Sequence, residues 1–290
     1  MPSLNIIGAG RLGRTLGCVW HRNGFFRVGS VCNRNPASAS AACKFIGAGA
    51  PAESIGAMPD ANCWLIATPD GELAAAAAQL GERLRRSSAP SIVFHCSGAL
   101  SSTLLAPCDP ERVASAHPVH SFADPAHSVE TLAGTSVAIE GGATALALLR
   151  RAFAAIGCET LDLAVENKSL YHAGSVFACN YLSVLMDISL LSFAAAGIPR
   201  AEALKLLKPI VEQTAQNNMR LGPEASLTGP IVRGDVETVS TQLRALEKVD
   251  TTLAEHYRRL GLACVGLARR SGLPEGDAER MVKVFSEAQL

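Results

Sequence analysis

A glycine-rich turn near the N-terminus constrains the fold of this chain more than any other feature. The segment Gly8-Ala9-Gly10-Arg11-Leu12-Gly13 has the form G-x-G-x-x-G, follows the apolar run Leu4–Ile7 and opens a helical pattern. In such a unit the first glycine permits a tight turn, the second lets a pyrophosphate approach the backbone, and the third allows close helix–strand packing. A plain strand-to-helix turn is the alternative. Position and spacing favour a dinucleotide site that includes Gly8, Gly10, Arg11, Leu12 and Gly13.

The first half of the chain alternates short β-rich runs with helical ones, which is typical of a parallel sheet covered by helices on both faces. The expected strands are Leu4–Ile7, Val28–Cys32, Cys63–Ala67, Ser91–His95, Arg112–Ala116, Ser136–Glu140 and Glu159–Leu163. The helices expected between them include Leu12–Asn23, Glu72–Arg86 and Thr144–Ile156. We therefore predict an α/β Rossmann domain, doubly wound around a mostly parallel sheet, over residues 1–165.

The second half carries helical patterns only. The expected helices are Asn167–Ala196, Pro199–Asn218, Val236–Lys248, Thr251–Ser271 and Pro274–Glu287, and the Gly/Pro-rich segment 221–235 is expected to be a loop. Asp235 and Asp250 are placed to cap two of these helices. The apolar stretch 181–198 contains Asp187, whose carboxylate is costly in hydrocarbon, so a buried helix is favoured over a membrane span. An all-α C-terminal domain is predicted for residues 166–290.

Composition excludes several classes of partner. The 26 Lys and Arg residues balance 26 Asp and Glu residues, and without a basic excess neither nucleic acid nor an anionic membrane is an expected partner. The nine cysteines include no C-x-x-C pair, so a zinc site or a disulfide framework is not expected. Residues 1–10 show no targeting pattern. We expect a cytoplasmic protein with reduced thiols and no metal.

The end of the second expected strand points to the type of cofactor. NAD sites usually have an Asp or Glu about 20 residues after the glycine turn, where it accepts hydrogen bonds from the ribose. This chain has no acidic residue before Glu53, and its strand ends in Asn33 and Arg34 instead. A guanidinium suits a 2′-phosphate, although Arg34 is also compatible with a solvated surface charge. NADP is therefore the predicted cofactor.

Two further strand ends are expected to line the same crevice, because ligands of such sheets bind outside the carboxyl ends of the strands. Thr68 and Pro69 follow one strand, and Ser97 and Gly98 follow the next. These residues are candidates for holding the nicotinamide half of the cofactor. Ordinary turn chemistry is the alternative for each of them.

The candidate acid/base residues are histidines. His117 and His120 follow a strand, but a structural role in the loop is favoured for both over metal binding or catalysis. In the long helix, Lys168 and His172 share one face, with Asn180 about 80° from His172 at its edge. A buried helix with satisfied polar groups is the alternative. The functional interpretation is that His172 and Asn180 face the nicotinamide across an interdomain cleft.

Several motifs in order carry a resemblance to a known group. The segments GAGRLG, ATPD, HCSGA, SAHPVHSF, YHAGSVFACNYL and LTGPIVRGD together resemble Rossmann-like proteins with a DUF2520-type C-terminal domain, often labelled NADP oxidoreductases, within the 6-phosphogluconate dehydrogenase-like superfamily. The group is also similar to 3-hydroxyisobutyrate dehydrogenase and to pyrroline-5-carboxylate and ketopantoate reductases. The resemblance implies a Rossmann domain followed by a helical domain that usually forms a homodimer.

The superfamily's catalytic pattern is only partly present. Its hydroxyacid dehydrogenases use a Lys and an Asn one helical turn apart, whereas here Lys168 is followed four residues later by His172, and Asn180 comes two turns further on. The hydroxyacid mechanism therefore does not transfer to this chain.

The combined features predict an NADP(H)-dependent oxidoreductase that moves hydride to or from a small carbonyl, imine or alcohol. His172 would be the acid/base, Asn180 or Ser97 would orient the substrate, and Lys168 would hold an anion or assist proton transfer. A reductase of cyclic imines is a second enzymatic possibility. A non-catalytic NADP-binding sensor or scaffold is the alternative from another class.

Overall fold

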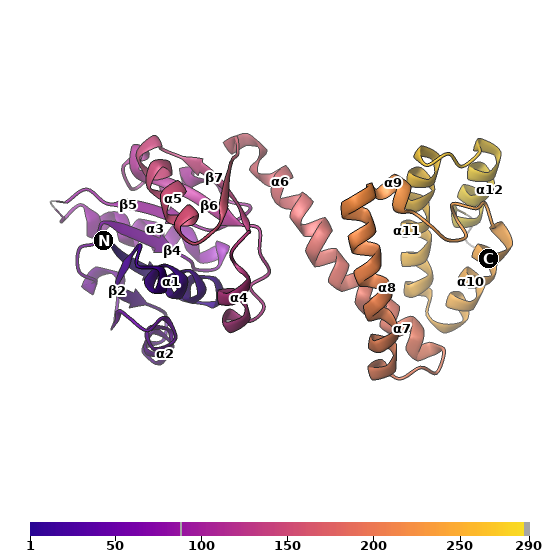
Figure 1. Cartoon of the computed structure of the whole chain (residues 1–290), viewed down its shortest axis with the longest axis horizontal. Helices are drawn as coiled ribbons and strands as arrows, with labels where there is room; N and C mark the ends of the chain where they lie inside the picture. Colours follow the sequence, from indigo (N-terminus) through magenta and orange to yellow (C-terminus); the bar gives the residue numbers. More distant parts are fainter. Residues whose placement is uncertain (88, 287–290) are drawn as a thin grey trace. The chain divides into compact units, whose positions relative to one another are not determined.

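The computed structural model describes residues 1–87 and 89–286. Its contacts divide the chain into two compact units, Met1–Asn180 and Tyr181–Leu290 (Figure 1). The division falls after the boundary expected at residue 165. The reason is that the first helical turns beyond this boundary bond to the sheet, Lys168 to Ser115 and Glu140 and Tyr171 to His117.

The first unit is built on one sheet of eight strands in the order β3-β2-β1-β4-β5-β6-β7-β8, in which only the β6–β7 pair is antiparallel. The strands are β1 Ser3–Ile7, β2 Arg27–Cys32, β3 Ala50–Ala52, β4 Cys63–Ile66, β5 Ile92–His95, β6 Val113–Pro118, β7 Ser136–Gly141 and β8 Glu159–Asp162. This confirms the predicted fold class and seven expected strands. The short edge strand β3 was not expected, because Pro51 interrupts any strand pattern there.

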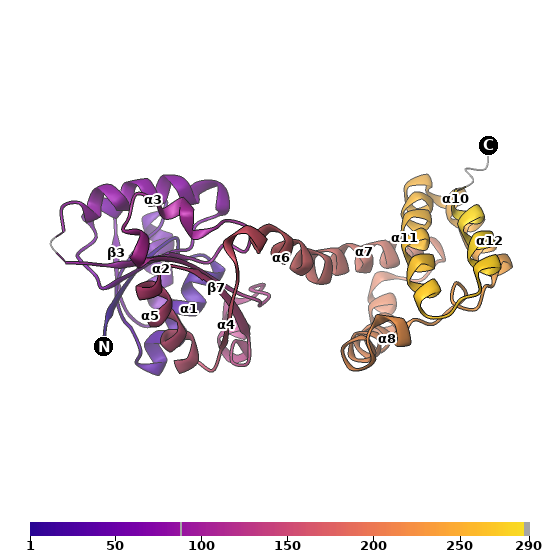
Figure 2. The same ribbon diagram turned by 90° about the horizontal axis from the view of Figure 1, so that it is seen from above.

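Helices cover both faces of the sheet, as Figure 2 shows for α3 on one side and for α1 and α5 on the other. The helices of this unit are α1 Arg11–Asn23, α2 Pro36–Ile46, α3 Asp70–Leu84, α4 Pro125–Thr131 and α5 Ala143–Ala155, with 3-10 turns at Ile55–Ala57, Ser102–Leu105, Pro110–Arg112 and Val165–Asn167. Trp20, Phe26, Phe94 and Phe153 fill the core on the α1/α5 face. Every residue of β4 and β5 is buried, as expected for strands covered on both sides.

The long helix expected at Asn167–Ala196 is interrupted by a π-helical turn. It consists of α6 Lys168–Ser175, the π turn Val176–Asn180 and α7 Tyr181–Ala195. A π turn accommodates one extra residue, so Asn180 comes to lie about 20° around the helix from His172 rather than about 80°. The turn therefore brings Asn180 onto the face of His172.

The expectation that stretch 181–198 is buried is wrong for the isolated chain. Along α7 only Leu190 is buried, whereas its exposed residues include Leu182, Val184, Leu185 and Leu191. A helix without charged residues along most of its surface has no polar face to turn to water, so this surface requires another apolar surface to cover it.

Length and composition alone would allow one helical segment to cross a membrane. Val165–Ala195 has 31 residues, and its most apolar 18-residue window has a mean hydropathy of 1.6 and is 6% buried. Its first part, however, belongs to the sheet unit, where Lys168 is paired with Glu140. Only the 15 residues of α7 lie outside that unit, fewer than the roughly 20 that a spanning helix needs.

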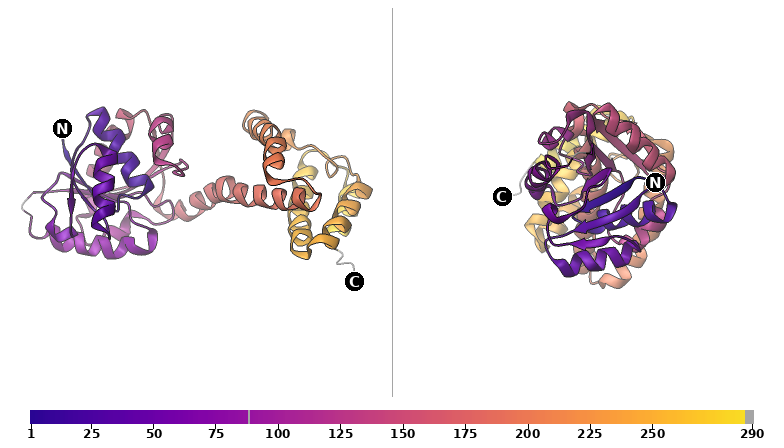
Figure 3. Two further views of the ribbon diagram at one scale, coloured as in Figure 1. Left: turned by 90° about the horizontal axis from the view of Figure 1, so that it is seen from below. Right: turned by 90° about the vertical axis from the view of Figure 1, so that its left-hand side faces the viewer.

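The second unit contains α7 and five further helices, α8 Arg200–Leu221, α9 Pro223–Ser226, α10 Val236–Val249, α11 Thr251–Arg270 and α12 Glu275–Ser286, within the described residues. The gold helices α10, α11 and α12 pack against one another (Figure 3) around Val239, Val265 and Met281. Asp235 and Asp250 accept backbone N–H groups as the predicted caps. The short helix α9 corrects the expected loop at 221–235, and the expected helix end at Glu287 lies outside the described residues.

Candidate functional site

The three glycines of the N-terminal turn are required for three different reasons. Gly8 has φ +84°, and a Cβ there would lie 2.7 Å from the backbone nitrogen of Thr68. A Cβ on Gly13 would lie 2.7 Å from the Gly8 carbonyl oxygen. At Gly10, by contrast, a Cβ would meet no heavy atom of the described residues within 4 Å. The space beside Gly10, at the start of α1, is therefore open to a ligand.

The start of α1 is suited to an anion. Gly10 is the N-cap, and no side chain of the described residues caps the helix; its first turn carries no acidic residue. The N–H groups of such a helix end, together with its dipole, attract phosphate. Nearby, the buried Thr68 hydroxyl has no hydrogen-bond partner within residues 1–87 and 89–286. Both observations fit a dinucleotide whose phosphates lie on this turn.

The sheet topology places this turn at a switch point. The chain runs from β1 outward to β2 and β3, then returns to β4 on the other side of β1. Ligands of open α/β sheets bind at such a point, outside the carboxyl ends of the strands. Thr68 and Pro69 follow β4, and Pro69 precedes α3 as its N-cap. Ser97 and Gly98 follow β5, so all four residues lie at the carboxyl ends of neighbouring parallel strands.

Asn33 and Arg34 differ in their contacts: the Asn33 amide is held by hydrogen bonds within the chain, whereas Arg34 is largely exposed. The Asn33 Oδ1 accepts from the Ala9 N–H at 2.6 Å, and its Nδ2 donates to the Ser38 hydroxyl at 3.1 Å. Asn33 therefore holds the glycine turn itself. Arg34 is 84% exposed and forms an ion pair with Glu72 on α3, 2.9 Å from Nη1 to Oε1.

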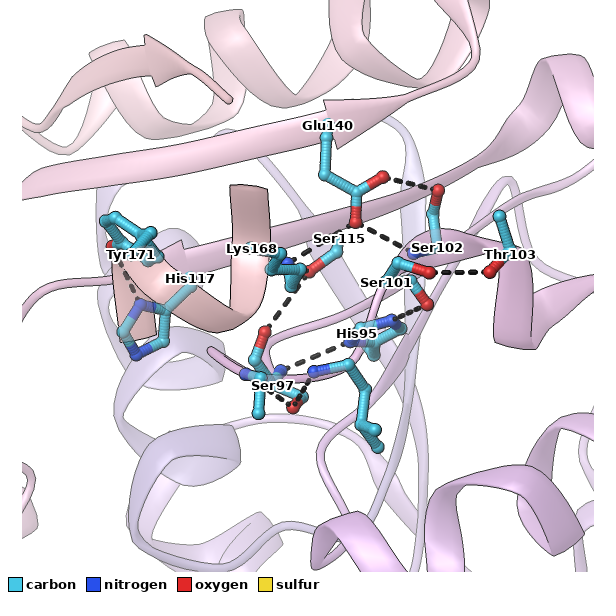
Figure 4. Close-up of polar contacts among 12 residues, drawn as sticks. His95, Ser97, Ser101, Ser102, Thr103, Ser115, His117, Glu140, Lys168 and Tyr171 are labelled. Carbon is cyan, nitrogen blue, oxygen red and sulfur yellow. Dashed lines mark hydrogen bonds and ion pairs between the residues drawn. The ribbon is translucent and has the colours of Figure 1, made fainter. Parts of the chain in front are cut away.

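A buried ion pair anchors α6 to the sheet. The Lys168 ammonium donates to the Ser115 hydroxyl at 2.5 Å and to the Glu140 carboxylate at 3.3 Å, and both charged side chains are 2% exposed (Figure 4). Glu140 lies opposite Ser115 in the antiparallel β6–β7 pair, so both side chains lie on one face of the sheet. Glu140 also accepts from the backbone N–H and the hydroxyl of Ser102, at 2.8 and 2.6 Å.

Lys168 therefore forms an ion pair with Glu140 in this structure. Burial lowers the pKa of Lys168, while the Glu140 carboxylate beside it acts in the opposite direction. Sequence reasoning considered Lys168 as a ligand for an anion but missed Glu140, its partner. The only signal for Glu140 was an acidic residue at the end of the apolar run SVAIE.

His95 and Ser97 form a second hydrogen-bonded group. The His95 Nδ1 accepts from the Ser97 N–H at 3.2 Å, so its Nε2 donates to the Ser101 carbonyl at 3.1 Å. Burial lowers the pKa of His95 to about 4, which keeps the ring neutral at neutral pH. The Ser97 hydroxyl donates to Asp70 at 3.0 Å and accepts two backbone N–H groups. Ser97 thus shapes the turn on which Gly98 lies.

Two histidines meet at Gly98. A Cβ on Gly98 would lie 2.3 Å from the His172 Nδ1 and 2.9 Å from the His117 Nε2, so no larger residue fits there without displacing the imidazoles. The His117 and His172 rings are 5.6 Å apart at 85°. His117 Nδ1 lies 2.9 Å from the Tyr171 hydroxyl, and Figure 4 shows these two side chains pointing toward one another.

The two rings differ in their hydrogen bonding. The His172 Nδ1 is buried against Gly98 and forms no hydrogen bond with the described residues. Burial, and then the neighbouring His172, lower the pKa of His117 to about 4. The structure therefore joins His172, which the sequence singled out, to His117 and Tyr171. Tyr171 was missed because its proximity to β6 cannot be read from helix periodicity.

Comparisons with known proteins identify two domain families along the chain. The model of a Rossmann-like domain matches residues 2–120, and the model of a domain of unknown function, DUF2520, matches residues 135–264. The chain belongs to the proteins that join these two domains. No curated protein matches it.

Three solved structures show how far the fold is shared. Protein TM1727 from Thermotoga maritima is 25% identical, with a TM-score of 0.66 over 95% of this chain and 98% of its own. The “putative NADP oxidoreductase BF3122” from Bacteroides fragilis is 20% identical, with a TM-score of 0.76 over 93% and 97%. The pyrroline carboxylate reductase of Plasmodium falciparum, solved with NADP bound, is 11% identical, with a TM-score of 0.59 over 98% of each chain.

Proposed function

We propose that this DUF2520 protein is an NADP(H)-dependent oxidoreductase that transfers hydride to or from a small carbonyl, imine or alcohol. The observation that carries the proposal is the glycine turn at the switch point, with open space at Gly10 and with the unpartnered hydroxyl of Thr68, a residue that contacts Gly8. The structures of a Bacteroides fragilis protein named for NADP and of a reductase with NADP bound support the choice of cofactor class.

Different residues of the first unit have different roles in the proposed reaction. The bound nicotinamide would supply or accept the hydride. The N–H groups at the start of α1 hold the phosphates, and Thr68 donates to the cofactor at the end of β4. The His172 imidazole gives a proton to the substrate oxygen or nitrogen, or takes one from it. His117, neutral and bonded to Tyr171, packs beside His172 and adds no positive charge to the site.

The remaining predicted catalytic residues take supporting roles. Lys168 fixes the start of α6 through Glu140, one helical turn before His172. Asn180 orients the substrate from the same face of the helix, where the π turn places it. Ser97 holds the loop that presents Gly98. The same arrangement suits a carbonyl or an imine substrate. In both cases the reduction adds hydride to carbon and one proton to the oxygen or nitrogen bonded to it.

Replacing Gly10 by valine tests the cofactor site directly. We expect the wild-type chain to bind NADP⁺ by titration calorimetry and the Gly10→Val variant to lose this binding, because the side chain fills the open space at the helix start. The fold should survive, since no described atom lies within 4 Å of the new Cβ. Gly266→Val in α11, an equally unobstructed glycine, serves as the control and should bind normally. A wild-type chain that binds neither NADP⁺ nor NAD⁺ contradicts the proposed function.

We further propose a cytoplasmic homodimer formed through the C-terminal helices, acting on a small molecule rather than on nucleic acid or a membrane. The support is the exposed apolar surface of the second unit, to which Leu182, Val184 and Leu191 on α7 and Leu206 and Ile210 on α8 contribute. Covering such a surface with a second copy is the usual way to remove it from water. Sedimentation equilibrium should give twice the chain mass, and Leu191→Asp with Ile210→Asp should shift it to the monomer. A monomeric wild-type chain contradicts the dimer.

A further inference from the structure

The ion pair between Arg34 and Glu72 spans the edge of the sheet at which the glycine turn begins. Arg34 follows β2 and Glu72 lies in the first turn of α3, which follows β4. These two strands flank β1 on either side. With Nη1 and Oε1 2.9 Å apart, the pair therefore bridges the end of β1, from which Gly8 continues.

This ion pair brings a carboxylate close to the end of β2, where the chain itself has no acidic residue. An Asp or Glu at the end of the second strand commonly accepts hydrogen bonds from the adenine ribose. In this chain the residues at that strand end are Asn33 and Arg34. The Asn33 amide is engaged by Ala9 and Ser38. Glu72, which is distant in sequence, is the carboxylate that the fold brings to Arg34.

A ligand could replace Glu72 as the partner of Arg34. The Arg34 side chain is 84% exposed and that of Glu72 39%, and exposed ion pairs contribute little stability. A phosphate dianion offers a guanidinium more charge and more acceptor oxygens than one carboxylate does. A ribose hydroxyl, in contrast, carries no charge with which to displace Glu72, but it can donate to a carboxylate.

We propose that Arg34 and Glu72 together read the 2′ position of the adenine ribose, with Glu72 as a second residue that determines cofactor specificity. A 2′-phosphate takes the Arg34 guanidinium from Glu72 and is repelled by the carboxylate it displaces. A 2′-hydroxyl donates to Glu72 while Arg34 stays paired. Glu72 therefore weakens the preference for NADP that Arg34 alone would impose. This inference rests on the proposed function, since it requires that a pyridine dinucleotide binds.

The Glu72→Gln variant separates the two effects. Calorimetric titration with NADP⁺ and with NAD⁺ at one fixed salt concentration should show NADP⁺ binding about 2- to 5-fold tighter and NAD⁺ binding weaker than in the wild type, because one exposed charge pair is worth up to about a fivefold change in a dissociation constant. Glu82→Gln is the matched control. It removes the same charge from an exposed position on the same helix and should leave the ratio of the two dissociation constants unchanged.

The Arg34→Gln background decides whether the pair acts as a unit. With Arg34 absent, Glu72→Gln should have a smaller effect on NADP⁺, because there is no guanidinium left to release and only the repulsion between carboxylate and phosphate is removed. Equal ratios for the wild type and Glu72→Gln, or an equal effect of Glu82→Gln, would overturn the inference while the proposed function stands. Absence of binding of both nucleotides to the wild type would instead remove the proposed function, and the inference with it.

Discussion

Replacing Lys168 by methionine is expected to lower the free energy of unfolding by about 3–5 kcal/mol, because it leaves the Glu140 carboxylate buried without a cation. Both side chains are 2% exposed, and the ammonium also donates to Ser115. The two Ser102 hydrogen bonds on Glu140 would remain, but they do not neutralise its charge. Urea denaturation followed by circular dichroism measures the change.

Two further variants show whether the ion pair itself is responsible. The double variant Lys168→Met with Glu140→Gln should recover part of the loss, because the uncompensated charge is gone. Arg259→Met breaks a pair on α11 whose side chains are 78% and 48% exposed, and it should cost at most about 1 kcal/mol. If Lys168→Met destabilises the chain no more than Arg259→Met does, Lys168 does not anchor α6 as described.

The sequence predicted the fold of the first unit because its signals are local. Strands such as β4 and β5 are continuous apolar runs, and α1 begins at a glycine motif with a known geometry. The misses also have local causes. The three residues of β3 are too few to show a period, and α2 is rich in serine and alanine, which blur the apolar stripe. Whether a segment forms a helix or a strand depends mainly on residues close to it in sequence, so a short stretch of sequence is enough to predict it.

The candidate site was predicted residue by residue but not as an arrangement. Gly8, Gly13, Thr68 and His172 could be singled out because each lies in a recognisable pattern. Their partners could not, because hydrogen bonds such as Lys168–Glu140 and Tyr171–His117 join positions far apart in the chain. The exposure of α7 could not be predicted either, because it also depends on contacts with distant parts of the structure. Composition shows that this helix must be covered, whereas what covers it depends on tertiary or quaternary structure.

Replacing His172 by glutamine should reduce turnover at least about 100-fold, the usual contribution of a positioned proton donor or acceptor. His172 Nδ1 is the buried, unpartnered nitrogen beside Gly98, whereas His117 is already bonded to Tyr171. Glutamine keeps a polar side chain of similar reach but cannot exchange a proton at neutral pH. Consumption of NADPH with a panel of small ketones, aldehydes and cyclic imines identifies a substrate and then measures the change.

The same experiment distinguishes chemistry from binding. NADP⁺ affinity by calorimetry should be unchanged in His172→Gln, because the phosphates are held at the glycine turn rather than at α6, so the loss would fall on the turnover number. His120→Gln is the matched control, since His120 contacts Thr135 and Phe122 and does not reach Gly98 through any described contact. Unchanged turnover in His172→Gln would exclude this histidine from proton transfer and make His117 the remaining imidazole at Gly98 able to perform it.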